Sequence, residues 1–394
     1  MHAENQLSFT KNILLYIQKD HTVQAELDYL FTHFCGEVVA ELNGTLTGKR
    51  IFACGDLSSI EDLETEIQII NGFTSNYTRL NTTVVELGQV PIAIENAGVY
   101  YRQLFLKDNY FENIKTAHDF QELTESNKTS KALRKGIYLT EVKKEEETYH
   151  FHLLRCSSNL TGPTANFKTT DHEIMHALNH AVTYDFELPT KLNHVLAQIY
   201  ENKKKDEGKE VKAKIKAHSD KTKDMPAEGL IAFCTFYDTI NFNQLQRSKT
   251  DPFDWCYKKS SGLTRLLFKL KPTVNDPTLT KEFSVTLYPN SAFLIPLSTN
   301  RLYTHEIRPS VLNIDKIPVR MGYVARCSNL EAVHQNNQTY IKENGELIQL
   351  TPMTSNSMDD LRDSYYEENN TINKVDYGKV HFSMNAGDYE KPIY

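Results

Sequence analysis

Short runs in which apolar and polar residues alternate recur through the second half of the chain, and they limit its fold more than any other feature. Between residues 264 and 326 the chain contains TRLLFKLK, EFSVTLYP, SAFLIPLS, RLYTHEI and IPVRMGYVAR. Alternation with a period of two is typical of β-strands, because successive side chains point to opposite faces of a sheet. Strands at this spacing predict a β-sandwich or jelly roll.

Earlier segments extend the same pattern and add one main helix. Further strands are predicted at 193–200, 210–218 and 229–238. Asp171 is expected to cap a helix whose apolar face includes Ile174 and Leu178. We therefore expect an α+β, mainly β protein with a double-stranded β-helix (jelly-roll) core and flanking helices.

The chain has 394 residues and no long Pro-, Gly- or Ser-rich linker, so the domain boundaries are soft. We expect an N-terminal region of mixed α/β structure at 1–148 that shapes a substrate lid. The jelly-roll core is expected at 149–330. A polar C-terminal extension, at most partly ordered, is expected at 331–394.

Composition narrows the class of protein. The formal net charge of -7 argues against a generally basic nucleic-acid-binding surface, although a local basic patch is compatible with it. The 6 cysteines form no CxxC pair, which argues against a zinc cluster and a small disulfide scaffold. No signal peptide and no long apolar run is evident, so we expect an intracellular protein, cytoplasmic or nuclear, without a membrane partner.

A metal site is the sharpest hypothesis that the residues support. His218 and Asp220 stand one residue apart at a predicted strand end, and His305 lies on a later strand. Two imidazoles and one carboxylate can bind ferrous iron on one face and leave three positions open. Because a His-x-Asp pair is common by chance, the hypothesis depends on the distant histidine and on what accompanies it.

Two arginines on the last core strand accompany this set. By strand alternation Arg320, Gly322 and Arg326 share one face, and Gly322 is expected to leave room beside Arg320 for a ligand. The two arginines lie roughly 20 Å apart along the backbone. They are therefore expected to bracket a diacid rather than to share one carboxylate.

In this order, these residues resemble the AlkB-like branch of the Fe(II)/2-oxoglutarate-dependent dioxygenases. The resemblance covers about residues 190–327 and rests on NHVLAQIYENK, AHSDKTKD, NRLYTHEI and the Arg-x5-Arg spacing. It implies that the metal ligands are His218, Asp220 and His305. It also implies that Arg320 binds the far carboxylate of 2-oxoglutarate and that Arg326 lies near its metal-chelating end.

The sequence departs from the family in several places. Tyr200 matches a family tyrosine that contacts 2-oxoglutarate, whereas Gln198 stands where the family has asparagine. The loop between Tyr200 and His218 is longer than in the family, and an insertion surrounds DPFDWCYKK. Both changes fall where a substrate would be selected.

The resemblance implies an oxidoreductase that uses Fe(II), 2-oxoglutarate and O2. Decarboxylation of 2-oxoglutarate would give succinate and carbon dioxide, and a substrate C–H bond would be hydroxylated. Hydroxylation of an N-methyl group would release formaldehyde. Methyl or alkyl groups on nucleobases are the favoured substrate, and the alternatives are a protein side chain, a small molecule, or a non-catalytic binding module of the same fold.

Other residues are weighed for the substrate side. Lys212, Lys214 and Lys216 alternate in register with His218, and some of them would meet an anionic substrate, although a solvated, charge-balanced loop also explains them. Candidates for lining the same side are Arg155 and Asn159, which share a predicted strand face, and Trp255, which would stack on a base. A turn that leads into the helix is the alternative for Arg155 and Asn159, and packing in the core is the alternative for Trp255.

Overall fold

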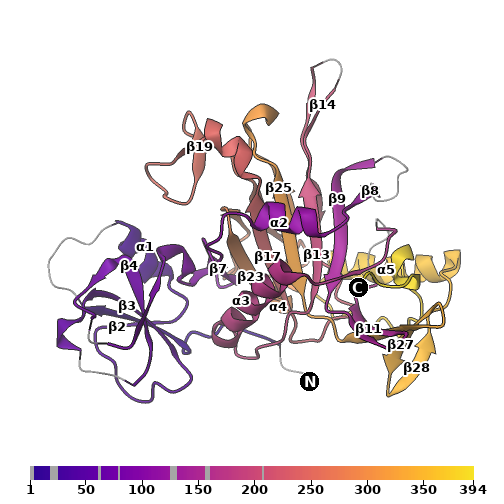
Figure 1. The fold of residues 1–394 in the computed structure, drawn as a ribbon, viewed down its shortest axis with the longest axis horizontal. Helices are drawn as coiled ribbons and strands as arrows, with labels where there is room; N and C mark the ends of the chain where they lie inside the picture. The colour runs from indigo at the N-terminus through magenta and orange to yellow at the C-terminus, as the bar shows by residue number, and fades with distance from the viewer. Residues whose placement is uncertain are drawn as a thin grey trace.

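The computed structural model describes residues 4–17, 25–60, 64–78, 80–124, 131–155, 160–205 and 208–394, and it is mainly β with helices at the flanks (Figure 1). The α+β, mainly β expectation is therefore confirmed. The helices are α1 (Ala25–His33), α2 (Tyr110–Ala117), α3 (Thr169–Asp185), α4 (Leu297–Leu302) and α5 (Ser355–Asn370). Within the described residues, none of these helices is long and apolar enough to cross a membrane.

A nine-stranded sheet forms the centre of the molecule. Its order is β12-β9-β13-β25-β17-β23-β7-β6, and β8 pairs with β9. The strands are β6 (Ile92–Ile94), β7 (Gly98–Tyr101), β8 (Gln121–Thr124), β9 (Lys131–Thr140), β12 (Ala165–Asn166), β13 (His194–Tyr200), β17 (Leu230–Tyr237), β23 (Ser291–Pro296) and β25 (Arg320–Arg326). Because β6 to β9 precede residue 149, pairing in this sheet continues across the expected domain boundary.

A second sheet has four strands in the order β16-β24-β21-β22. These are β16 (Ile215–His218), β21 (Arg265–Leu270), β22 (Glu282–Thr286) and β24 (Tyr303–Arg308). The sheets contact each other through aromatic side chains: the ring centroids of Phe233 and Phe268 lie 6.3 Å apart, and those of Phe268 and Phe293 lie 5.6 Å apart. The two sheets therefore share one hydrophobic core.

Strand alternation divides the central sheet into a helix-covered face and a cavity face. Met321 and Tyr323 of β25 are fully buried, and the Tyr323 hydroxyl donates to Asp171 of α3 over 3.0 Å. The opposite face carries the predicted set that includes Arg320, Gly322 and Arg326. The α3 helix begins at Thr169, so Asp171 lies in its first turn rather than at its cap; its carboxylate accepts the Lys168 N–H and contacts buried His118.

The N-terminal part contains a five-stranded parallel sheet in the order β2-β1-β3-β4-β5. Its strands are β1 (Asn12–Ile17), β2 (Glu37–Val39), β3 (Arg50–Asp56), β4 (Ile67–Ser75) and β5 (Thr82–Val85). Buried Arg50 joins this sheet to α3, because its guanidinium pairs with Asp185 at 2.8 Å and also donates to Tyr101. The lid role expected for residues 1–148 stays a prediction.

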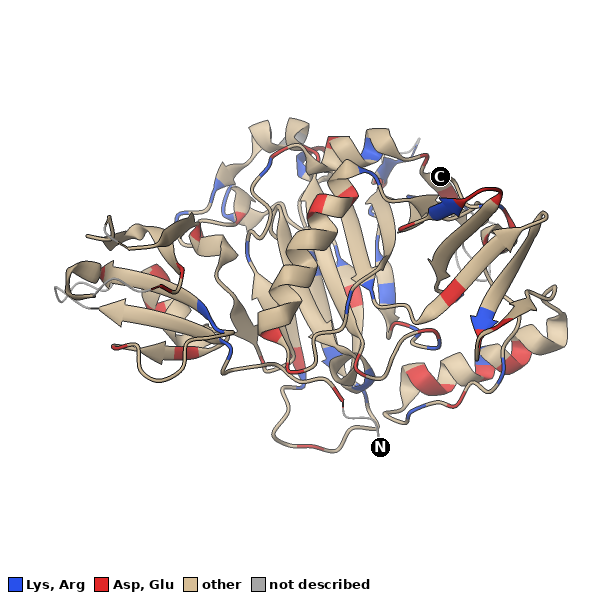
Figure 2. Ribbon diagram, turned by 60° about the horizontal axis from the view of Figure 1, so that its bottom comes forward, with Lys and Arg blue, Asp and Glu red and all other residues tan. Residues whose placement is uncertain are grey.

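The C-terminal part is regular, and the expectation of partial order was wrong. A five-stranded antiparallel sheet contains β10 (Lys143–Glu145), β11 (Thr148–Leu153), β26 (Leu330–Gln335), β27 (Gln338–Glu343) and β28 (Glu346–Gln349). The α5 helix buries one stripe, Leu361, Tyr365 and Glu368. Acidic residues are visible along the helix in Figure 2. They make the segment polar on average, so its composition does not reveal the buried stripe.

Two small sheets complete the described strands. The first is a two-stranded hairpin, β14 (Lys203–Lys204) with β15 (Glu210–Val211), which projects from the end of the central sheet (Figure 1). The second consists of β18 (Gln246–Arg247), β19 (Trp255–Tyr257) and β20 (Ser260–Ser261). The predicted strand at 210–218 is thus divided between β15 and β16.

Candidate metal centre and co-substrate cavity

Two side chains of the four-stranded sheet and one from the loop that follows β16 meet at one point. The ligand atoms that His218, Asp220 and His305 could offer all lie within 4.8 Å of one another. Oδ1 of Asp220 is 3.6 Å from Nε2 of His218 and 3.6 Å from Nε2 of His305. The structure therefore brings together the three residues that the sequence singled out.

Local pairing places the two histidines side by side. His218 ends β16 and is the direct cross-strand partner of His305 on β24. Nδ1 of His218 lies 2.9 Å from the Lys216 carbonyl, and because a carbonyl only accepts, Nδ1 must carry the proton. A neutral ring with its proton on Nδ1 keeps the Nε2 lone pair for a metal, and Nε2 is the nitrogen that lies nearest Oδ1 of Asp220.

Asp220 is held by both its backbone and its side chain. The amide of Asn300 accepts the Asp220 N–H and donates to the Asp220 carbonyl, each over 2.8 Å. Arg326 donates to Oδ2 through Nε at 2.8 Å and contacts it through Nη2 at 2.7 Å, which leaves Oδ1 facing the histidines. Burial opposes ionisation, but Arg326 and the histidines lower the pKa of Asp220 to about 2.

His305 lies deeper than His218. It is 4% exposed, and its ring contacts Phe233 and Phe268 at centroid distances of 5.1 and 5.7 Å. Burial, reinforced by the neighbouring His218, lowers the pKa of His305 to about 3. The imidazole is therefore neutral near pH 7, as metal coordination requires.

These ligands open onto a cavity of about 720 Å³ between the two sheets. Asp220 is the only carboxylate among its described lining residues. Arg and Lys supply the other charged side chains of the lining: Arg134, Lys214, Lys216, Lys221, Arg320, Arg326 and Arg362. The cavity is therefore basic in a chain whose formal net charge is -7.

Arg320 lies in this cavity as a buried cation. It is 4% exposed, and its guanidinium stacks on Tyr200, 3.9 Å from the ring centroid. Its Nη2 finds no hydrogen-bond partner among the described residues, and an unsatisfied buried donor is costly. A Cβ at Gly322 would lie 3.0 Å from Nη1 of Arg320, so the missing side chain leaves room for the arginine itself rather than for a ligand.

The other residues implied in co-substrate binding also reach the cavity. Tyr200 lines it and donates from its hydroxyl to Gln198 over 3.2 Å. Gln198 lines it as well. Arg326 pairs with Asp220 and therefore lies close to the candidate metal ligands.

The lysines that were expected to share a face separate in the structure. Lys214 and Lys216 are exposed and line the cavity. Lys212 instead donates to the carbonyls of Ser310 and Leu312 over 2.8 and 2.6 Å. Alternation does not hold for all three because the strand is interrupted between β15 and β16.

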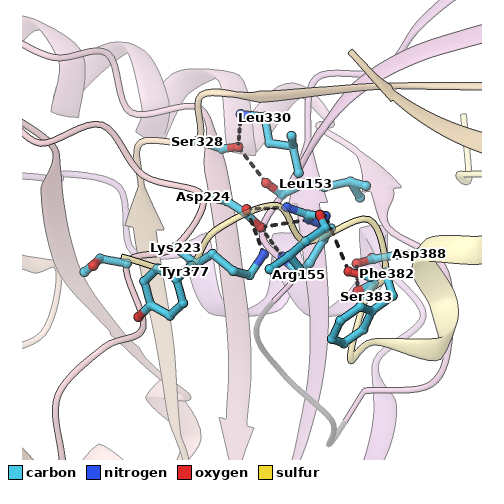
Figure 3. A network of polar contacts seen from close by, with 12 residues as sticks. Leu153, Arg155, Lys223, Asp224, Ser328, Leu330, Tyr377, Phe382, Ser383 and Asp388 are labelled. Atoms are coloured by element: carbon cyan, nitrogen blue, oxygen red, sulfur yellow. Dashed lines mark hydrogen bonds and ion pairs between the residues drawn. The ribbon is translucent and has the colours of Figure 1, made fainter. Parts of the chain in front are cut away.

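Two further substrate-side candidates lie away from the cavity lining. Arg155 is buried and pairs with Asp224 at 2.8 Å, as Figure 3 shows. Trp255 packs against Phe242 at 4.7 Å between ring centroids, and Arg247 lies 4.6 Å from its ring. The third candidate, Asn159, lies outside the described residues.

Sequence reasoning missed several residues that line the cavity. Arg134 of β9 is in register with Tyr200, which in turn is in register with Arg320, so these side chains occupy one row across the sheet. Tyr365 and Asn369 come from α5, in the segment expected to be a polar extension. The only signal in the sequence was the helical spacing of Leu361, Tyr365 and Glu368, which are now seen to be buried.

Comparisons with known proteins leave the family open. No family model and no curated protein matches the chain. One similar solved structure, of OsALKBH1, has 14% sequence identity and a TM-score of 0.33; the match covers 58% of this chain and 97% of that one. Another, the non-heme alpha-ketoglutarate-dependent epimerase SnoN from nogalamycin biosynthesis, has 10% identity and a TM-score of 0.32, with coverage of 61% and 81%. Similarity at this level assigns neither a family nor a substrate.

Proposed function

We propose that this chain is an Fe(II)/2-oxoglutarate-dependent dioxygenase, with the two facing sheets as its double-stranded β-helix core. The observation that carries the proposal is the meeting of His218, Asp220 and His305 in a cavity that also holds Arg320, whose Nη2 has no hydrogen-bond partner in the described part of the chain. Two histidines and a carboxylate suit ferrous iron with open positions. A buried, unsatisfied guanidinium suits a carboxylate that arrives with the co-substrate.

The residues of the cavity would have separate roles in binding the metal and the co-substrate. Iron and 2-oxoglutarate, when bound, supply the oxidation of a C–H bond by O2. His218, Asp220 and His305 would hold the metal, and Arg320 would bind the far carboxylate of 2-oxoglutarate while stacked on Tyr200. Arg326 would orient Asp220, because it donates to Oδ2 and leaves Oδ1 facing the histidines.

Modified nucleic acid is our proposed substrate, with a methyl or alkyl group of a nucleobase as the oxidised position. The basic lining supports this choice, since Lys and Arg side chains dominate affinity for phosphate. Lys214 and Lys216 are exposed, and so is Arg362 of α5, which also lines the cavity. An N-methyl substrate would release formaldehyde after hydroxylation.

A protein side chain or a small molecule is the second candidate, because α5 sets acidic residues beside the cavity. Asp359, Asp360 and Asp363 are exposed on this helix, whose acidic positions are visible in Figure 2. Their charge would repel an extended polyanion but not a small anion that enters the basic cavity. A non-catalytic binding module is the third candidate, and measurable turnover would exclude it.

The deciding experiment measures succinate formed from 2-oxoglutarate with ferrous iron, with and without a methylated oligonucleotide. Wild type should turn over and His218→Ala should not, whereas His176→Ala, an exposed histidine on α3, should behave as wild type. Stimulation by the oligonucleotide would favour nucleic acid over the other substrates. Equal succinate from wild type and His218→Ala would refute the enzyme proposal.

A second experiment tests the nucleic-acid choice directly. Lys214→Glu/Lys216→Glu should weaken oligonucleotide binding and lower the slope of log affinity against log salt by about 1 for each lost phosphate contact. The control is Lys143→Glu/Lys144→Glu on β10, which makes the same change in net charge on exposed residues of a different sheet. If both double variants bind alike, the cavity lysines do not meet nucleic acid.

A further inference from the structure

The C-terminal helix reaches the loop that connects the candidate metal ligands. Asn369, in the last turn of α5, accepts the Ser219 N–H through Oδ1 over 2.7 Å. Ser219 is the single residue between His218 and Asp220, and it is 6% exposed. A helix distant in the sequence therefore contacts the link between two of the three ligands.

A neighbouring residue of α5 holds the other side of Asp220. Glu368 accepts the Thr222 N–H over 3.1 Å and also the Thr222 hydroxyl. The Lys221 ammonium lies 4.0 Å from the ring centroid of Tyr365. The helix thus contacts the loop at three residues, 219, 221 and 222.

The end of α5 is itself firmly held. Lys271, 1% exposed, donates to the carbonyls of Glu368 and Thr371 over 2.7 and 3.0 Å, where a helix C-terminus favours a cation. Leu361 and Tyr365 pack against Phe382 in a separate apolar cluster. The segment that contains Phe382 is fixed in turn, because Arg155 donates to the Phe382 carbonyl while paired with Asp224 (Figure 3).

The loop needs such support because it lies beyond the end of β16 and has no ladder hydrogen bonds of its own. Asn300 holds the Asp220 backbone from one side, and Asn369 holds the Ser219 N–H from the other. Metal–ligand distances tolerate changes of only about 0.2 Å. Rotation of the backbone at Ser219 would move the Asp220 carboxylate relative to His218.

We propose that Asn369 is a positioning residue of the metal site: by accepting the Ser219 N–H, it keeps the His218 and Asp220 ligand atoms directed at the point where they meet His305. The inference rests on the proposed metal site. It gives the C-terminal helix a role in metal binding that the sequence resemblance, which ends near residue 327, does not cover.

The test measures Co(II) affinity and the visible absorption of bound Co(II), which reports ligand geometry, in the full chain. Asn369→Leu removes the acceptor and should weaken Co(II) binding about 10- to 100-fold, the usual effect of losing a residue that orients metal ligands. Asn369→Asp keeps an acceptor and should bind nearly as wild type. The matched control is Asn370→Leu, since the side-chain amide of Asn370 donates to the Tyr366 carbonyl of its own helix rather than to the loop.

The outcomes separate this inference from the function on which it rests. Wild-type affinity and an unchanged Co(II) spectrum in folded Asn369→Leu would overturn the positioning role alone. Equal Co(II) binding by wild type and His218→Ala would overturn the metal site and the inference together. If Asn369→Leu does not fold, Asn369→Ala, which adds no bulk, is compared with Asn369→Asp under the same criteria.

Discussion

Replacing Arg320 by Met should remove most of the affinity for 2-oxoglutarate. The guanidinium is 4% exposed, stacks 3.9 Å from the Tyr200 ring centroid and leaves Nη2 without a partner among the described residues. Truncating one member of a buried, hydrogen-bonded charge pair costs about 2–5 kcal/mol. At about 1.4 kcal/mol for each factor of ten, 2-oxoglutarate should bind about 30- to 4000-fold more weakly.

The assay is a calorimetric titration of 2-oxoglutarate into protein loaded with Co(II), which needs no turnover. Co(II) affinity should be unchanged in Arg320→Met, because the arginine is not one of the candidate ligands, and this verifies that the site is folded. Arg134→Met is the control, since Arg134 occupies the same row of the sheet but is only partly buried. Similar 2-oxoglutarate affinity in Arg320→Met and Arg134→Met would refute the assignment of the far carboxylate to Arg320.

Three further predictions concern packing and protonation. Gly322→Ala would place a methyl group 3.0 Å from Nη1 of Arg320, so it should raise the KM for 2-oxoglutarate while Co(II) affinity stays constant. Asp224→Ala should lower the free energy of unfolding in urea by about 3–5 kcal/mol, because buried Arg155 loses its counter-charge; a loss below 1 kcal/mol would contradict this. Burial raises the pKa of Asp388 from 3.8 to about 7, so the folded protein retains a proton that the unfolded chain releases, and stability should fall between about pH 4 and pH 7. Asp388→Asn should remove that decline, worth at most about 4 kcal/mol, and an unchanged pH dependence of urea unfolding would exclude the assignment.

Much of the candidate site was predictable because its residues follow strand periodicity. Alternation placed Arg320, Gly322 and Arg326 on one face, and the structure shows all three lining the cavity. The same rule fails for Lys212, which lies in the break between β15 and β16. Its ammonium donates to the backbone carbonyls of Ser310 and Leu312. Periodicity is reliable only while a strand is continuous.

Partners from distant segments were not predictable. Arg155 was considered for the substrate side, but a carboxylate from Asp224 neutralises it in the interior. Arg326 was expected to help bracket a diacid, a role that stays a prediction, and the structure pairs it with Asp220. Which opposite charge a buried arginine meets depends on how separate segments pack, and no local pattern encodes that choice.

By itself, the sequence determined the mainly β class, the main strands and the residue types of a possible iron site, because each follows from a few neighbouring residues. Tertiary structure alone decided that Asp220 and the two histidines converge and that Arg320 is buried with its Nη2 unpaired among the described residues. It also decided that α5 packs against the loop between the ligands. The acidic surface residues of α5 made its segment look like a polar extension in the sequence. The role of its buried stripe depends on the loop and the apolar cluster against which the stripe packs.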